Sequence, residues 1–372
     1  MIGFTLNFGE PVVVADIVAA GNYDTAVIPA PPLGEKKYLK CKDYEPFGFV
    51  QKTYIIKNNL CIALAGTADE MKDFLFAFTS YLAGYEEVIT QSHVIDFLHK
   101  YPKRKFNQAA VVVLLIEYEA GVPTGTRRLA LPSESFKEVQ SNYFDLTSAA
   151  GPGKERLLAK VAAAPGFTGH AEGSVQRTMQ RNISLFAQLL AEDKMSGDTT
   201  PGIFGAGFEA IFFNGHSFVK LDKVAYIICT CAVDEHGKIA LPVPKAVMYY
   251  EYAGDILFIR SIEIGKSKNE ITAAGLILSA MPADYTIDLF DIAPVNDQPD
   301  CPGYSRPANL SFFSSHIALT YALVTQNGSI SYSSVYSPLT GISVKYTDGE
   351  GIAITLKPEV SQRIIDGAKE FG

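Results

Sequence analysis

The sequence predicts an α+β protein built in two parts, and three observations support this. The 372 residues exceed what a single hydrophobic core usually organises. A content of 48% hydrophobic and 19% charged residues indicates that both parts are packed. The first 206 residues mix strand-like and helix-like patterns, whereas short strands dominate from Gly207 onward. We therefore predict an α+β domain over residues 1–235 and a β-rich accessory domain over residues 236–372.

The N-terminal elements begin with two hairpins. Apolar runs on either side of Gly9 and Glu10 predict the first hairpin over residues 1–15, and Asn58-Asn59 predicts the turn of a second one over residues 51–65. Prolines predict a long loop over residues 23–47. Thr67 is a helix cap, and apolar spacings of three and four extend this helix to about Leu82. The same patterns predict helices over 92–101, 153–164 and 173–193, and strands over 109–117 and 127–131.

The C-terminal elements are strands separated by turn signals such as Asn214-Gly215 and Gly254. Residues 276–289 fit either a helix or strands, and the prolines of residues 294–307 predict a loop. A helix over 359–371 closes the chain. The predicted strands cover residues 208–213, 217–221, 225–232, 245–252, 256–264, 317–324, 329–336 and 351–356.

Composition excludes several classes of function. A net charge of −8 and a pI near 5.4 argue against nucleic acid and anionic membrane surfaces as partners. The longest apolar runs, over 109–116 and 224–229, fall short of the ~20 residues that cross a bilayer. Because the first 35 residues contain no Lys or Arg, we expect no signal peptide and a cytoplasmic location. The five cysteines have no metal-ligand or disulfide spacing, so we expect no metal and no cofactor.

Four stretches in matching order resemble the proteasome β-subunit family of N-terminal nucleophile hydrolases. The first is PVVVAD at residues 11–16, and the second is QKTYIIKNNLCIALAGTAD at 51–69. The third is LTSAAGPGKERLL at 146–158, and the fourth is DKMSG at 193–197. The resemblance implies a four-layer αββα sandwich over residues 1–235, two packed sheets with helices on each outer face. It also implies assembly into a homo-oligomeric ring.

The resemblance also implies a catalytic site. In this class the amine of the first residue activates that residue's own hydroxyl or thiol, and a lysine held by an aspartate tunes it. Lys52 and Asp16 would be that lysine and aspartate. Asp193, Ser196 and Ser148 would orient the amine and its proton path, and the backbone N–H of Gly66 would contribute to an oxyanion hole.

The start of the chain departs from this pattern. Met1 and Ile2 carry no group that can attack a carbonyl. Thr5 is the nearest hydroxyl, but four strand residues displace it by roughly 13 Å from the first position. We therefore expect a proteasome-like scaffold that acts through self-assembly or through a peptide or protein partner. The alternative is an amide hydrolase of the threonine-peptidase type, activated by an unrecognised cleavage.

Two further features of the sequence give weaker functional signals. Gly151-Pro152-Gly153-Lys154 departs from a phosphate-binding loop, because Ser148 replaces its first glycine and Glu155 follows the lysine. Tyr249, Tyr250 and Tyr252 suggest a carbohydrate or peptide groove in the C-terminal part. Since neighbouring strand residues face opposite sides, part of this set at most meets one ligand.

Overall fold

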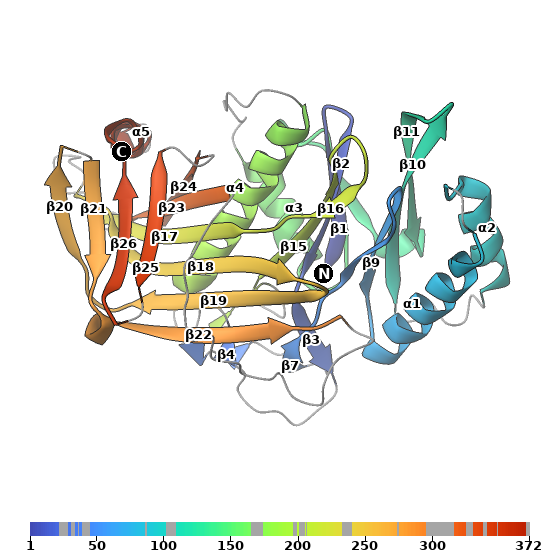
Figure 1. The fold of residues 1–372 in the computed structure, drawn as a ribbon, viewed down its shortest axis with the longest axis horizontal. Coiled ribbons are helices and arrows are strands. Elements are labelled where there is room, and N and C mark those ends of the chain that lie inside the picture. Colours follow the sequence, from blue (N-terminus) through green and yellow to red (C-terminus); the bar gives the residue numbers. More distant parts are fainter. Residues whose placement is uncertain are drawn as a thin grey trace.

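The protein is mostly β. In this computed structural model, the described residues form 26 strands and five α-helices. The strands are organised in two pairs of larger sheets. Helices α1 (Ala68–Ala83) and α2 (Gln91–Lys100) lie at one end of the molecule, α3 (Lys154–Ala163) and α4 (Ser174–Met195) in the middle, and α5 (Pro358–Lys369) beside the C-terminal sheets (Figure 1). The structure describes residues 1–21, 29–30, 34–35, 37–38, 45–85, 88–101, 109–164, 174–195, 199–200, 205, 207–232, 240–273, 275–294, 316–324, 330–337, 341–347 and 349–369.

The first sheet has six antiparallel strands and contains the predicted first hairpin. In spatial order they are β12 (Lys137–Val139), β13 (Leu146–Ala150), β1 (Ile2–Asn7), β2 (Glu10–Asp16), β15 (Phe208–Phe213) and β16 (Phe218–Lys220). β1 is therefore an inner strand, paired with β13 on one side and β2 on the other. The hairpin register pairs Ile2 with Ala15, so Met1 lies beside Asp16 at the end of β2.

The second sheet has four antiparallel strands and contains the predicted second hairpin. In spatial order they are β11 (Val122–Leu131), β10 (Ala110–Glu119), β9 (Leu60–Ala65) and β8 (Thr53–Lys57). One face of this sheet packs against the first sheet, because alternate residues such as Val13 and Val112 form a shared buried cluster. The outer parts of β10 and β11 extend beyond β9 as a two-stranded ribbon (Figure 1).

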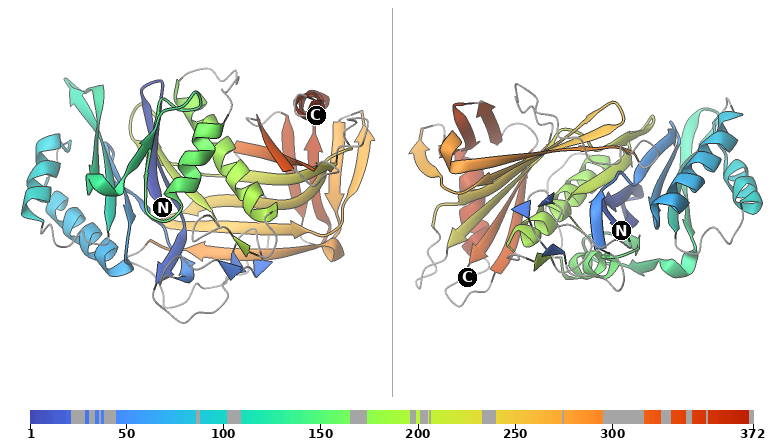
Figure 2. Two further views of the ribbon diagram at one scale, coloured as in Figure 1. Left: turned by 180° about the vertical axis from the view of Figure 1, so that it is seen from behind. Right: turned by 90° about the horizontal axis from the view of Figure 1, so that it is seen from below.

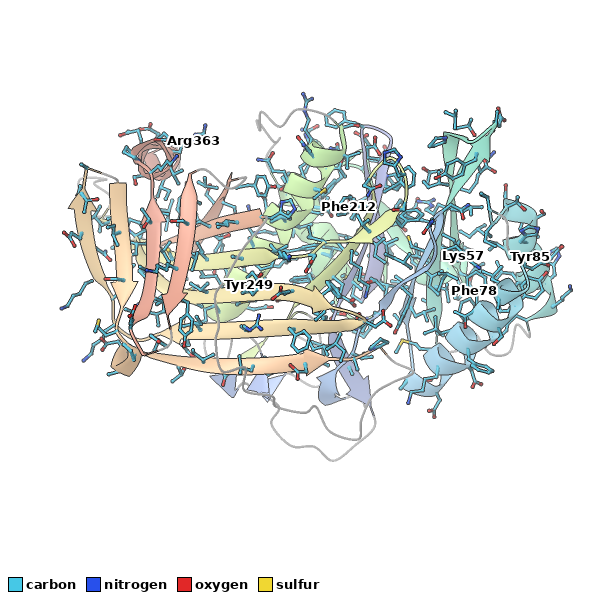
Figure 3. All side chains as sticks on the ribbon, viewed as in Figure 1. Lys57, Phe78, Tyr85, Phe212, Tyr249 and Arg363 are labelled. Carbon is cyan, nitrogen blue, oxygen red and sulfur yellow. The ribbon has the colours of Figure 1, made fainter. Side chains whose placement is uncertain are left out.

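Two helices, α1 (Ala68–Ala83) and α2 (Gln91–Lys100), cover the other face of the second sheet, and both were predicted. The hydroxyl of Thr67 accepts a hydrogen bond from the N–H of Glu70, as expected of a helix cap. Phe74, Phe78 and Phe97 pack against β9 and β10 in one buried cluster (Figure 3 labels Phe78). The apolar stripe of α1 thus fixes its orientation on the sheet.

The helices α3 (Lys154–Ala163) and α4 (Ser174–Met195) lie in the middle of the molecule (Figures 1 and 2). α4 contacts β1, β2 and β15 on one side and strands of the C-terminal half on the other. Of its 22 residues, 13 are buried, because sheets pack on two of its faces. The predicted four-layer αββα sandwich is therefore wrong for this protein. The structure is β-rich, and this helical layer is an internal layer and not an outer one.

The C-terminal half is a β-sandwich of a six-stranded and a four-stranded sheet. The six-stranded sheet contains β22 (Tyr285–Ile292), β19 (Ile256–Ile264), β18 (Val243–Ala253), β17 (Val224–Ala232), β23 (His316–Val324) and β24 (Ile330–Ser337), with β17 and β23 parallel. The strands of the smaller sheet run across it (Figure 1): β20 (Lys268–Thr272), β21 (Gly275–Ala280), β26 (Gly351–Leu356) and β25 (Ile342–Thr347). Val360 and Ile364 of α5 (Pro358–Lys369) complete the core between the two sheets.

The predicted domain boundary near residue 235 falls between β17 and β18, which pair directly in one sheet. The C-terminal sheet thus begins at Val224, before that boundary, and the division into domains stays a prediction. Residues 276–289 contain strand β21, a 3-10 turn over Pro282–Asp284 and part of β22. Most of the predicted loops over 23–47 and 294–307 lies outside the described residues.

The remaining elements are short. They are β3 (Val18–Gly21), β4 (Pro29–Ala30), β5 (Gly34–Glu35), β6 (Lys37–Tyr38), β7 (Glu45–Phe49), β14 (Thr199–Thr200) and a 3-10 turn over Ser133–Ser135. None of the helices in the described part of the chain has the length and hydropathy needed to span a membrane.

Candidate functional site

The predicted lysine and aspartate meet the chain's amino terminus inside the protein. Asp16 Oδ1 accepts a hydrogen bond of 2.7 Å from the amine of Met1 and one of 2.5 Å from Lys52 Nζ. The backbone N–H of Gly205 donates to Asp16 Oδ2 at 3.3 Å. Asp16 is fully buried, and Lys52 is 6% exposed. We call Met1, Asp16 and Lys52 the amine cluster.

Strand pairing places these three residues together. The hairpin of β1 and β2 brings Met1 to Asp16, and the N–H of Asp16 donates to the carbonyl of Met1 at 3.2 Å. Lys52 precedes β8, and its carbonyl accepts the N–H of Leu64 on β9. Because the two N-terminal sheets pack face to face, the lysine side chain crosses from one sheet to the aspartate of the other.

Burial dominates the electrostatics of the amine cluster. The pKa of the Met1 amine is lowered from 8.0 to about 5, chiefly by burial; Asp16 opposes this change, and nearby Lys52 adds to it. At neutral pH the amine is therefore mostly uncharged, and Asp16 and Lys52 form the ion pair. Such an amine can accept a proton, but the thioether of Met1 cannot attack a carbonyl.

Asp193 lies next to the amine cluster but does not enter it. Its Oδ1 accepts a hydrogen bond of 2.5 Å from Arg156 on α3. Gly205 separates it from Asp16, since a Cβ added at Gly205 would fall 2.3 Å from Asp193 Oδ2. Gly205 thus lies between Asp193 and Asp16, and among the described residues the hydrogen bond of the Met1 amine goes to Asp16.

The other predicted site residues are more dispersed. Ser148 on β13 lies opposite Phe4, and its buried hydroxyl has no hydrogen-bond partner in the described part of the chain. Gly66 follows the end of β9 with a φ of 141° and is exposed. It is close to the start of the chain, because a Cβ at Gly151 would approach both Met1 and Ala65 within 4 Å. Ser196 lies outside the described residues.

Thr5 is not at the amine cluster. It is fully buried, and its hydroxyl donates to Asn182 Oδ1 at 3.0 Å. A cleavage that exposed its amine would remove Ile2 to Phe4 from a strand paired on both edges. This geometry argues against Thr5 as a processed nucleophile.

Glu209, a buried carboxylate on β15, was not predicted as a site residue. Its Oε2 accepts the backbone N–H of Lys52 at 2.6 Å, so it holds the residue that supplies the cluster's lysine. A signal was available, because Glu209 is the charged residue within the otherwise apolar strand FEAIFF. Gly205 was missed as well, since its contribution is a backbone N–H that leaves no pattern in the sequence.

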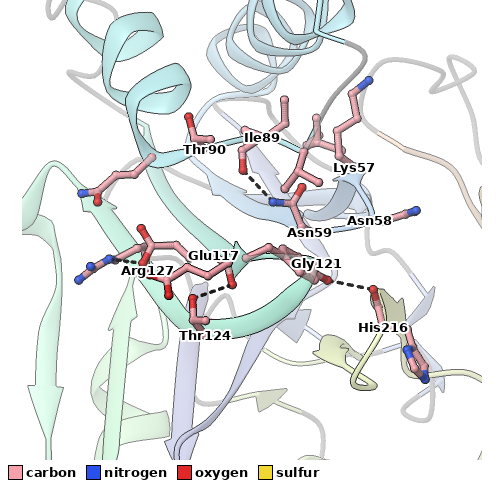
Figure 4. A pocket seen from close by; sticks show the side chains of 15 residues that line it. Lys57, Asn58, Asn59, Ile89, Thr90, Glu117, Gly121, Thr124, Arg127 and His216 are labelled. Carbon is pink, nitrogen blue, oxygen red and sulfur yellow. Dashed lines mark hydrogen bonds and ion pairs between the residues drawn. The ribbon is translucent and has the colours of Figure 1, made fainter.

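A second candidate site is a groove of about 1260 Å³ under the ribbon of β10 and β11 (Figure 4). Its walls carry charges of both signs, and Arg127 and Glu117 form an ion pair of 2.9 Å there. At its floor, Asn59 Nδ2 donates to the carbonyls of Ile89 and Ile116. The groove is open, its lining is partly polar and partly apolar, and the strand edge of β10 beyond Leu115 is not paired with β9.

The proposed tyrosine groove is wrong. Tyr249 (labelled in Figure 3) and Tyr250 are 1% and 3% exposed, and they belong to cores on opposite sides of β18. The suggested phosphate loop likewise shows another role, because Lys154 Nζ donates to the carbonyl of Ser135 at 3.0 Å. Both features therefore contribute to packing or to loop structure.

Comparisons with known proteins do not assign the chain to a family. No protein-family model matches it, and a search of curated proteins finds no match. The resemblance to proteasome β-subunits thus rests on the four sequence stretches and stays a prediction. The amine cluster and the groove are therefore the features from which a function can be inferred.

Proposed function

We propose that this protein is a non-catalytic scaffold that acts through self-assembly or by binding a protein or peptide partner. One observation carries the proposal. Met1 occupies the position from which a nucleophile would act, and its amine is buried and hydrogen-bonded to Asp16, which also binds Lys52. The residue is 2% exposed. A peptide carbonyl therefore has neither an attacking atom nor access at this point.

The buried ion pair fits a structural role. Asp16 and Lys52 join the two N-terminal sheets, and a buried carboxylate with well-placed donors specifies one arrangement of its surroundings. The open groove between the ribbon and α2 offers a place for a polar, extended partner segment. A homo-oligomeric state and a cytoplasmic location are parts of this proposal.

The test combines three measurements on protein purified from its natural host. Intact mass identifies the first residue, a panel of fluorogenic peptide amides reports hydrolysis, and light scattering after size exclusion gives the oligomeric state. We expect an uncut Met1, no turnover above a Lys52→Met control, and a defined oligomer or a stable complex. A mature chain that begins with Thr, Ser or Cys and hydrolyses the peptides would overturn the proposal in favour of the threonine-peptidase alternative.

A further inference from the structure

Both neighbours of Lys52 in the chain are held by hydrogen bonds. Gln51 is bound to the C-terminal half of the protein, and Thr53 is bound to Glu209. Gln51 is fully buried, and its Nε2 donates to the carbonyls of Asp255 and Ile292 at 2.5 and 2.6 Å. Its backbone N–H donates to the carbonyl of Ala293 at 3.2 Å. Gln51 is thus bound to the β18–β19 turn and to the end of β22, all in the C-terminal six-stranded sheet.

Glu209 completes this attachment. Its Oε2 accepts the N–H of Lys52 at 2.6 Å, and its Oε1 accepts the hydroxyl of Thr53 at 3.0 Å. The hydroxyl of Tyr252, on β18, donates to the same Oε1 at 3.0 Å. Lys220 Nζ lies 3.4 Å from that oxygen and donates to Gln51 Oε1 at 2.5 Å. Glu209 therefore connects the backbone of Lys52 directly to the C-terminal sheet.

We propose that Glu209 is a positioning residue through which the C-terminal six-stranded sheet sets the place of Lys52 in the amine cluster. A lysine side chain is flexible, so its reach to Asp16 depends on where its backbone is held. Here the backbone is held on both sides by contacts that lead to β18, to the β18–β19 turn and to β22. The proposal assigns a role to the C-terminal half and does not depend on whether the protein is catalytic.

The pKa of the Met1 amine provides a readout that a change in packing alone would not shift. The titratable groups facing it are Asp16 and Lys52, and those facing Glu209 are Lys220 and Tyr252. Lys52 lowers the pKa of the amine, so an amine whose lysine has moved away should bind its proton more tightly. Removal of the Glu209 charge by itself would act in the opposite direction, since a lost negative charge favours the neutral amine.

The experiment is a pH titration of the full-length chain labelled with 13C at the α-carbon of methionine. The chain has six methionines, and Met→Leu variants at the other five positions identify the Met1 signal. We expect a midpoint near 5 in the unchanged protein. In Tyr252→Phe and in Glu209→Gln the midpoint should rise by about one unit.

Tyr336→Phe is the matched control, because it removes a hydroxyl of the same sheet that contacts His316, on a strand that β17 and β23 separate from β18. Its midpoint should equal that of the unchanged protein. An unshifted midpoint in Tyr252→Phe, or an equal shift in Tyr336→Phe, would overturn the proposal. If Glu209→Gln does not fold, the isosteric Tyr252→Phe variant decides the question alone.

Discussion

Replacement of Asp16 by Asn should severely destabilise the protein. At neutral pH Asp16 and Lys52 form the ion pair and the Met1 amine adds a hydrogen bond, at 2.5 and 2.7 Å. Loss of one partner from a buried pair leaves the other charge uncompensated and costs about 3–5 kcal/mol. Lys52 is 6% exposed, so water cannot replace the lost carboxylate.

Urea unfolding at pH 7 followed by circular dichroism measures this loss, since the chain contains no tryptophan for fluorescence. The double variant Asp16→Asn/Lys52→Met removes the stranded charge and should recover about 2 kcal/mol of the loss. Lys52→Met alone should cost less than Asp16→Asn, because the Met1 amine can take up a proton and pair with Asp16. A loss below about 1 kcal/mol in Asp16→Asn, or no recovery in the double variant, would refute the reasoning.

Three further predictions concern the Met1 amine, Gly205 and Phe8. The pKa of the Met1 amine is 8.0 when exposed and about 5 in the fold, so the unfolded chain binds the extra proton between these values. Its contribution to stability is therefore complete above pH 8 and falls by about 4 kcal/mol as the pH drops to 5; denaturation of N-terminally acetylated protein should lack this slope. Gly205→Ala should cost more than about 2 kcal/mol of stability, because φ is +107° and the new Cβ would meet Asp193. Gly254→Ala should cost less, since no atom lies within 4 Å of its new Cβ. Thermal unfolding compares the two variants, and equal losses of stability would contradict the clash at Gly205. Phe8→Asn should raise the melting temperature, because Phe8 has a φ of 53° and is 51% exposed at a turn that favours Asn-Gly; a lowered value would mean that the contacts of Phe8 with Arg177 and Arg181 outweigh the strain.

Local patterns predicted the elements well where one side of an element faces a core. The hairpins around Gly9 and Asn58-Asn59, the helix cap at Thr67 and the helices α1 to α5 all follow from turn chemistry and apolar spacing. The layer order was wrong, because the periodicity of α4 shows that it buries apolar residues but not that a third sheet covers it. That sheet is assembled from strands far apart in the sequence, such as β17 and β23, in which Val224 lies opposite His316.

The candidate site was likewise predictable only in part. The pairing of Asp16 with Lys52 was expected from the resemblance. The absence of a nucleophile was expected from the side chains of Met1 and Ile2. The contacts of Glu209, Gln51 and Tyr252 were not predictable, because they join three sheets whose relative position no local pattern encodes.

The sequence by itself determined the helices, the two N-terminal hairpins and many of the C-terminal strands, and that residue 1 carries no nucleophile. These properties depend on backbone preferences and on the chemistry of single side chains. Only the tertiary structure decided that the Met1 amine is buried against Asp16 and that the C-terminal sheet reaches the neighbours of Lys52. Burial and proximity arise from long-range packing, and it is burial that lowers the pKa of the amine.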